Sequence, residues 1–122
     1  MNGLSDLKWT SRFVDETPGD SIIGGNPRQV FEACWSRVEP TKIPKPKVVA
    51  WSEEMAAEIG LDKKEAALLS GNEISEGMNP YAQCYGGHQF GTWARQLGDG
   101  RAITLGEVET EGKILELQLK GS

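Results

Sequence analysis

The chain has 122 residues, a formal net charge of −5, and 38% hydrophobic and 25% charged residues. These values fit one folded domain and exclude an intrinsically disordered chain, and no stretch approaches the run of about eighteen apolar residues that a transmembrane helix needs. Seven acidic residues and only two lysines lie between Ser52 and Glu76, whereas the other eleven acidic residues are matched by eleven basic ones. Because no basic stripe is present to follow a phosphate backbone, the sequence disfavours binding to nucleic acid.

The first residues, 1–6, show neither the basic and apolar regions of a secretory signal nor an arginine-rich transit pattern. We therefore expect an intracellular protein, which is cytoplasmic if no presequence precedes these residues. Cys34 and Cys84 lie far apart and belong to no cluster of cysteine and histidine with the spacing of a zinc site. In a reducing compartment, this usage predicts two buried thiols rather than a structural disulfide.

Scattered apolar residues in the range 4–13 predict a packing arm that anchors Trp9 and Phe13 against the main body. The next apolar segment fits the face of a helix as well as the alternation of a strand. Pro40 would end a helix there, so we predict a strand over Cys34–Val38. The first third of the chain is therefore expected to be mostly a wrapped surface segment.

A capped helix is predicted after the apolar stretch Val48–Trp51, which has the composition of a short buried strand or an extended run. Ser52 is a good N-cap, and two glutamates follow it in the first turn, where the helix dipole favours negative charge. Met55 and Ile59 are spaced to share the buried face, and Gly60 supplies the C-terminal stop.

A second short helix is predicted directly afterwards. Asp62 has the chemistry of an N-cap, for a helix from Lys63 to Leu69 that ends at Ser70 and Gly71. The acidic residues of both helices are most simply a solvated face. We interpret this pair of helices as a scaffold without chemistry of its own.

The last third of the chain is predicted to be rich in strands. Tyr81–Tyr85 has high strand propensity, and the glycine-rich stretch after it carries interleaved aromatic residues. A hairpin is predicted at the end, with strands over Ala102–Val108 and Lys113–Lys120 joined by Glu109–Gly112. The second strand alternates, with Leu115, Leu117 and Leu119 on one face and Glu116, Gln118 and Lys120 on the other.

The glycine-rich turn before this hairpin is the strongest candidate for chemistry. Gly98 and Gly100 leave backbone N–H groups accessible to an anion, Arg101 can bind a phosphate, and Lys120 follows at the end of the second strand. A dinucleotide fingerprint would open a helix and a Walker loop would continue with Gly-Lys-Ser/Thr, so the context excludes both. A glycine turn, a strand, a turn and a strand ending in lysine is how protein kinases open their nucleotide site, although Ile103 stands where the third glycine would be.

Plainer interpretations exist for each of these residues. Gly-Asp-Gly is also an ordinary turn that Asp99 would stabilise, and a terminal lysine such as Lys120 also protects an edge strand. His88, the only histidine, is interpreted as a hydrogen-bonded structural residue, and Gln96 is also expected to be structural.

Three segments resemble the N-terminal part of the selenoprotein O family, and most closely its eukaryotic plant- or alga-like members. They are NPYAQCYGGHQFG at 79–91, QLGDGRAITLGEV at 96–108 and LQLKG at 117–121. Weaker similarity extends back to residue 7, so the resemblance covers nearly the whole chain. These motifs are far more specific than a bare glycine turn.

The resemblance implies a kinase-like fold that binds ATP in a flipped orientation, with Mg²⁺, and transfers AMP to Ser, Thr or Tyr hydroxyls of proteins. Gly98, Gly100 and Arg101 would contact the nucleotide, and Lys120 would hold its phosphates. Eukaryotic relatives imply a mitochondrial location.

The chain also departs from the family pattern. It reads Lys-Gly-Ser at 120–122, where the family continues Lys-Gly-Ala-Gly, and Arg95 stands where a glycine is usual. The helix glutamate that pairs with the lysine, the catalytic aspartate and the metal ligands have no counterparts, so no catalytic or metal residue is predicted in this chain.

We therefore predict an α+β fold in which 1–80 form a packing segment with short helices and 81–122 form the start of a kinase-like N-lobe. The predicted function is an adenylyltransferase fragment that is inactive alone. The alternative is a non-catalytic module that docks on a partner, or on a second copy, through its exposed last strand.

Overall fold

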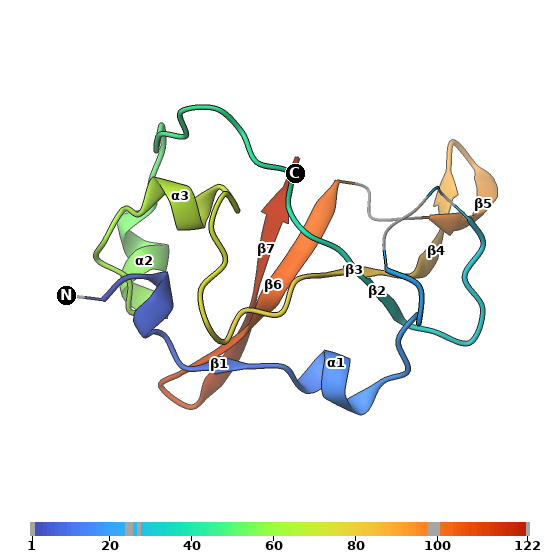
Figure 1. Ribbon diagram of the computed structural model, residues 1–122, viewed down its shortest axis with the longest axis horizontal. Coiled ribbons are helices and arrows are strands. Elements are labelled where there is room, and N and C mark those ends of the chain that lie inside the picture. Colours follow the sequence, from blue (N-terminus) through green and yellow to red (C-terminus); the bar gives the residue numbers. More distant parts are fainter. Residues whose placement is uncertain (1, 24–25, 27, 98–100, 122) are drawn as a thin grey trace.

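The computed structural model describes residues 2–23, 26, 28–97 and 101–121, and it combines one larger antiparallel sheet, a separate two-stranded sheet and short helices (Figure 1). The elements in chain order are η1 (Leu4–Asp6), β1 (Trp9–Thr10), α1 (Arg12–Glu16), β2 (Trp35–Arg37), α2 (Glu53–Ile59), α3 (Ala66–Leu69), β3 (Tyr81–Gln83), β4 (Tyr85–Gln89), β5 (Thr92–Leu97), β6 (Ala102–Thr110) and β7 (Lys113–Lys120). The mixture of helices and strands confirms the α+β prediction at the level of fold class.

Strand β6 is the centre of the larger sheet. Strand β7 pairs with it from Ala102↔Lys120 to Thr110↔Lys113, which confirms the predicted hairpin. Its turn is tighter than expected, because the strands continue until only Glu111 and Gly112 remain between them, both with positive φ. The other edge of β6 pairs with β1 and with β3, and β3 pairs with β2.

Strands β1 and β2 come from residues before position 80, yet they lie in the same sheet as β6. The packing segment and the predicted lobe are thus joined by backbone hydrogen bonds. The boundary between 80 and 81 remains a prediction, as does the kinase-like character of the second part.

The hydrophobic core lies between one face of the β6–β7 hairpin and the helices. Its buried members are Leu4, Ala56, Ile59, Leu61, Leu68, Met78, Leu105 and Val108, with Leu115, Leu117 and Leu119 packed against them. The three leucines of β7 therefore face the core, as predicted. Figure 1 shows α2 and α3 on the side of the hairpin nearer to the N-terminus.

Helix α2 is capped as the sequence predicts. The Ser52 Oγ accepts a hydrogen bond from the Met55 N–H at 3.2 Å, and Gly60 adopts φ +88° while the Leu61 N–H reaches the Ala56 carbonyl at 2.7 Å. The prediction for its buried face is wrong in one position. The Met55 side chain is 49% exposed, and the core-facing pair is Ala56 and Ile59.

The second helix is shorter than predicted, because Asp62 has a different role. The Asp62 carboxylate accepts a hydrogen bond from the Asn2 N–H at 2.7 Å, and the N–H groups of Asp62 and Lys63 donate to the Asn2 carbonyl. These bonds tie the N-terminal arm to the chain, so the helix begins only at Ala66. Its end at Ser70 and Gly71 agrees with the prediction.

The N-terminal arm anchors the sheet through the residues that were expected to do so. Leu4 is buried in the core, and the Trp9 indole N–H donates to the Leu4 carbonyl at 2.8 Å. The Phe13 ring stacks on Tyr81 with centroids 5.3 Å apart. By contrast, the stretch Val48–Trp51 forms no strand, and Val49 is 85% exposed, so only the expectation of an extended run is correct there.

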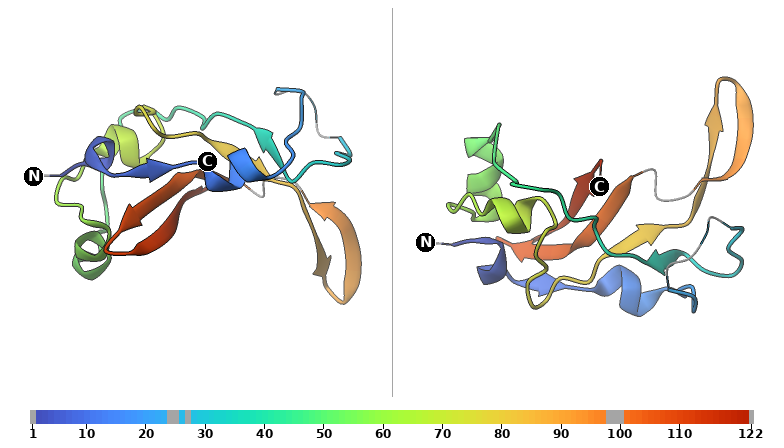
Figure 2. Two further views of the ribbon diagram at one scale, coloured as in Figure 1. Left: turned by 90° about the horizontal axis from the view of Figure 1, so that it is seen from below. Right: turned by 45° about the horizontal axis from the view of Figure 1, so that its top comes forward.

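The predicted strand at 81–85 is divided between two sheets at Cys84, whose N–H donates to the Cys34 carbonyl at 2.8 Å. Strand β3 precedes this point, and β4 and β5 follow it as a hairpin that projects from the rest of the chain (Figure 2). Arg95 in β5 has φ +63°, a conformation that glycine adopts without strain.

Candidate functional site

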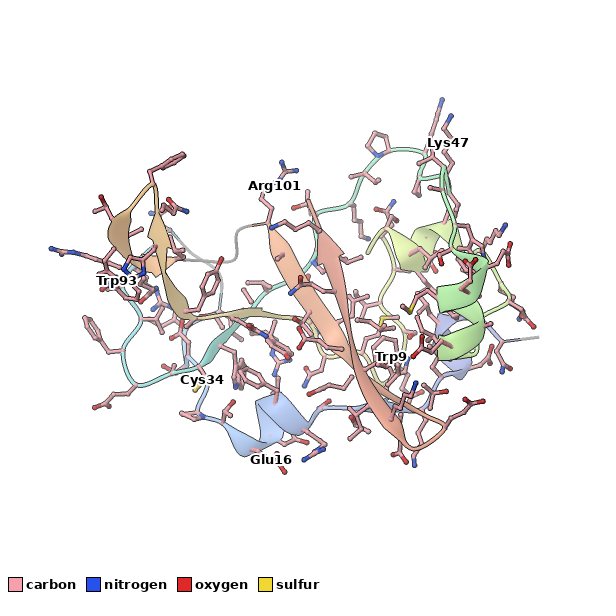
Figure 3. The ribbon with its side chains drawn as sticks, turned by 180° about the vertical axis from the view of Figure 1, so that it is seen from behind. Trp9, Glu16, Cys34, Lys47, Trp93 and Arg101 are labelled. Atoms are coloured by element: carbon pink, nitrogen blue, oxygen red, sulfur yellow. The ribbon has the colours of Figure 1, made fainter. Side chains whose placement is uncertain are left out.

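Arg101 and Lys120, two of the four residues predicted to bind a nucleotide, lie together at the open end of the β6–β7 hairpin. Ala102 pairs with Lys120, and the ladder continues by one residue because the Gly121 N–H donates to the Arg101 carbonyl at 2.6 Å. The Arg101 guanidinium also donates to the Gly121 carbonyl at 2.6 Å. Figure 3 shows Arg101 at this end of β6. The antiparallel pairing thus brings the backbones of two cationic residues, nineteen positions apart in sequence, to the same end of the hairpin.

Gly98 and Gly100 lie outside the described residues, as does Asp99, so their predicted roles stay predictions. The sequence places them directly before Arg101.

Lys120 lies on the polar face of β7, as the alternation predicts. Lys120, Gln118 and Glu116 are exposed, whereas the leucines between them are half-buried against the core. Backbone pairing adds cross-strand neighbours on this face, with Ala102 opposite Lys120 and Thr104 opposite Gln118.

Next along this face, a hydrogen-bonded cluster surrounds Glu116, and sequence reasoning assigned it no role. The buried Thr104 hydroxyl donates to the Glu116 Oε1 at 2.8 Å, and the Gln83 amide donates to the same oxygen at 3.5 Å. Tyr81 is only 1% exposed, and its hydroxyl has no hydrogen-bond partner among the described residues. Burial raises the pKa of Tyr81 to about 12, with smaller contributions from the Glu116 and Glu107 carboxylates.

Two carboxylates face each other across the hairpin, because Glu107 pairs with Glu116 in the β6–β7 register. Glu107 is 8% exposed, and its Oε1 accepts a hydrogen bond from the Phe13 N–H at 3.0 Å. Its Oε2 has no partner among the described residues. Like charges directly opposite each other destabilise an antiparallel pair, and neither carboxylate forms an ion pair with a described residue to compensate. The alternation of side chains along β7 was the sequence signal that could have identified Glu116, since it places this residue on the same polar face as Lys120.

The remaining candidates have structural contacts. The Gln96 amide accepts from the Val30 N–H at 2.8 Å and donates to the Arg28 carbonyl at 3.3 Å, which confirms its structural role. His88 packs edge-on against Trp93 with ring centroids 5.0 Å apart, and its imidazole makes no hydrogen bond to a described residue, so the expected hydrogen bond is not found. Cys34 and Cys84 are free thiols that are half-buried, less enclosed than predicted.

No group of three or more acidic, histidine or cysteine side chains within the described ranges has the arrangement to hold a metal ion. We derive no step through a metal. No helix in the described residues is long and apolar enough to cross a membrane.

A cavity of about 290 Å³ lies between the stretch 47–51 and helix α3. It is lined by Lys47, Val48, Ala50, Trp51, Ala66, Leu69 and Ser70. Figure 3 shows Lys47 well separated from Arg101, so this cavity is not part of the hairpin end.

Comparison with known proteins agrees with the motifs. A family model described as "Protein adenylyltransferase SelO" matches residues 27–122. A protein nucleotidyltransferase YdiU of Aromatoleum aromaticum is 52% identical over 130 residues, which cover 98% of this chain and 25% of the relative. Proteins of the same name from Methylobacillus flagellatus and Tolumonas auensis are 51% and 50% identical, over 95% and 98% of this chain and 24% of each relative. The chain thus spans about a quarter of the length of these curated relatives.

Proposed function

Since the chain belongs to the SelO family of protein adenylyltransferases, we propose that it forms the phosphate-binding edge of an ATP site in an enzyme that transfers AMP to proteins. The observation that supports this proposal is the pairing of Ala102 with Lys120, which brings the backbone of the lysine beside that of Arg101, the residue that directly follows the glycine turn at 98–100 in sequence. Two cations at one end of a hairpin suit a polyphosphate, because each can donate charge-assisted hydrogen bonds to its oxygens.

In the proposed reaction, a Ser, Thr or Tyr hydroxyl oxygen of a substrate protein forms a bond to the α-phosphorus of ATP. The bond from that phosphorus to the oxygen bridging to the β-phosphate breaks, pyrophosphate leaves with the electron pair, and the hydroxyl proton passes to a base. Lys120 and Arg101 would hold the phosphates and balance their charge. We assign no proton acceptor and no metal ligand to this chain, and we propose that it does not catalyse the transfer alone. Incubation with labelled ATP, Mg²⁺ and a protein substrate tests this, since transfer above background would overturn it.

Within this proposal, the glycine turn, the β6–β7 hairpin and Lys120 correspond to the opening of a kinase-like N-lobe, with the nucleotide in the flipped orientation that the resemblance implies. We also propose a eukaryotic plant- or alga-like origin and, for such a member, a mitochondrial location. Fractionation of the source cells with an antibody to this chain tests the location, and recovery in the cytosol would contradict it.

Nucleotide binding is tested by titrating the ¹⁵N-labelled 122-residue chain with ATP and following amide shifts by NMR. We expect the shifts to change at the open end of the hairpin, and Lys120→Ala to raise Kd by about ten-fold or more, the value of a hydrogen bond to a charged group. Lys113→Ala is the matched control, because Lys113 lies at the opposite end of β7, where it pairs with Glu58 at 3.0 Å. Equal affinities of the two variants, or no ATP binding by the wild type, would refute the proposal.

A second candidate function is docking through β7. Among the described residues β7 pairs only with β6, so its other edge presents unpaired backbone groups that can add a strand. Sizing by light scattering discriminates the two candidates. Association that rises with concentration and is insensitive to ATP supports docking, whereas a monomer whose melting temperature rises with ATP supports the nucleotide site.

A further inference from the structure

Cys34 and Cys84 are fifty positions apart in sequence, yet the fold places them opposite each other. In the antiparallel ladder of β2 and β3, Trp35 pairs with Gln83 at one end. The next position in the same register belongs to the two cysteines, and the Cys84 N–H donates to the Cys34 carbonyl at 2.8 Å. The sequence gave no sign of this pairing, because it depends on how two distant strands align.

The two thiols also belong to the same face of the sheet. Cys34 and Ser36 are two positions apart, so the alternation along β2 directs their side chains to one side. The Cys84 Sγ lies 4.0 Å from the Ser36 Oγ, which brings the second thiol to that side as well. Opposite residues of a hydrogen-bonded antiparallel pair have Cα atoms about 5.5 Å apart. This separation falls within the range of about 4.4–6.8 Å that disulfides span.

The cysteine pair closes the larger sheet at the point where the chain leaves it. Strand β4 begins at Tyr85, the residue after Cys84, and Figure 2 shows the β4–β5 hairpin departing from the sheet there. The Cys34 N–H donates to the Pro18 carbonyl at 2.7 Å rather than across the pair, so a single backbone hydrogen bond joins the two cysteines. Both thiols are free and only half-buried, which leaves them open to a small reagent.

We propose that Cys34 and Cys84 are a modification site, at which a low-molecular-weight disulfide such as oxidised glutathione introduces a reversible disulfide that clamps the base of the β4–β5 hairpin. One cysteine thiolate attacks a sulfur of the small disulfide, whose S–S bond breaks, and a small thiolate leaves with the electron pair. The second cysteine thiolate then attacks the protein sulfur of this mixed disulfide and releases the other small thiolate. The two protein thiols are thereby oxidised, the small disulfide is reduced, and the two thiol protons pass to the released thiolates.

The position within the ladder makes this bond reversible rather than structural. Residues of a hydrogen-bonded pair are farther apart than those of a non-hydrogen-bonded pair, so the disulfide closes under strain. Strained disulfides are the more easily reduced ones, and they suit regulation better than permanent support. The inference goes beyond the proposed nucleotide site and does not depend on it.

The test equilibrates the 122-residue chain with mixtures of reduced and oxidised glutathione, in native buffer and in urea, and blocks the remaining thiols by alkylation. Trypsin cleaves after Arg37, between the two cysteines, so a linked pair of peptides in the mass spectrum identifies the bond. We expect the equilibrium constant for forming it to be about ten-fold or more larger in native buffer, because the fold holds the thiols together. Equal constants in the two solvents, or disulfides between chains in place of the linked peptides, would overturn the inference.

Single variants and hydrogen exchange provide the controls. Cys34→Ser and Cys84→Ser each leave one thiol, so they should accumulate only the mixed disulfide with glutathione. In the oxidised wild type, the Cys84 amide should exchange more slowly than in the reduced protein, because its acceptor carbonyl belongs to the linked residue. The Lys113 amide, in the β6–β7 hairpin, should exchange at the same rate in both forms. Unchanged exchange at Cys84 in a chain that contains the disulfide would refute the clamp.

Discussion

Substitution of Gly71 by alanine tests how tightly Gly71 packs against Leu119, the residue before Lys120, and against Pro40. Gly71 follows α3 with φ +80°, and an added Cβ would lie 2.6 Å from the Leu119 Cδ1 and 2.6 Å from the Pro40 Cβ. Gly112, in the β6–β7 turn, has nearly the same backbone angle at φ +75°, but nothing lies within 4 Å of its added Cβ. The pair therefore separates backbone strain from steric overlap.

The expected magnitudes follow from these two environments. Alanine in the left-handed conformation costs about 1–2 kcal/mol of free energy of unfolding, and this is the whole effect expected for Gly112→Ala. Gly71→Ala carries the same strain and also overpacks the contact between Leu119 and Pro40, which adds about 1–3 kcal/mol. We therefore expect Gly71→Ala to be the more destabilising variant by that second amount.

Urea unfolding followed by tryptophan fluorescence measures both variants, with the slope of the transition checked to be unchanged. Equal losses for the two variants would refute the packing of Leu119 and Pro40 over Gly71. Because Leu119 directly precedes Lys120, Gly71→Ala should also weaken ATP binding, whereas Gly112→Ala should leave it as in the wild type. ATP binding that is insensitive to Gly71→Ala would show that the site does not depend on this contact.

Two further predictions concern groups with shifted pKa values. Tyr81→Phe should leave the free energy of unfolding at neutral pH unchanged or slightly higher, because the buried hydroxyl has no partner among the described residues; a loss of about 1 kcal/mol would reveal a hydrogen bond. Between pH 10.0 and about 12 the wild type, but not this variant, should lose stability, since the unfolded chain releases the tyrosine proton before the native state does; urea unfolding across that range measures both. The pKa of Asp20 is lowered from 3.8 chiefly by its hydrogen bond from Arg28, then by the Ile22 N–H and, less, by Ser36. The Asp20 carboxylate therefore stabilises the native state above pH 3.8, and this stabilisation is lost as the pH falls through the lower pKa of the native state. The free energy of unfolding of Asp20→Asn should accordingly fall less steeply with decreasing pH than that of the wild type; an unchanged dependence on pH would contradict this.

Local signals in the sequence were sufficient for the hairpin and the capped helix. Alternation along 113–120 placed Lys120 on the polar face because side chains of a strand point to opposite sides with period two. Ser52 and Gly60 identified the ends of α2 because their chemistry acts within a few residues of themselves. These predictions needed no knowledge of the rest of the fold.

The errors arose where a distant segment competes for the same group. Asp62 has the chemistry of an N-cap, but its carboxylate accepts a hydrogen bond from the backbone N–H of Asn2, sixty residues away. Met55 has the right spacing for a core residue, yet the sheet meets the helix on the side of Ala56 and Ile59. The opposition of Glu107 and Glu116 was likewise invisible, because it depends on the register between two strands. Spacing along one strand could not supply that register.

That register depends on a β-bulge at Gly106, and the bulge is what allows β6 to contribute to the core and to the polar face at once. The pairing shifts between Thr104 and Gly106, so that Val108 joins the leucine face while Glu107 lies on the polar face. Unbroken alternation after Leu105 would have sent Glu107 into the core and Val108 to solvent.

Glycine is required at the bulge for two reasons. Gly106 has φ +144°, and a Cβ there would lie 3.0 Å from the Trp9 ring of the N-terminal arm. The arm packs against β6 beside the bulge, and β1 pairs with β6 at the adjacent residues 107 and 108. The same glycine therefore fixes the arm, the core face and the position of Glu107 opposite Glu116. An isolated glycine between Leu105 and Val108 was the sequence signal for it, because it interrupts the apolar alternation by one residue.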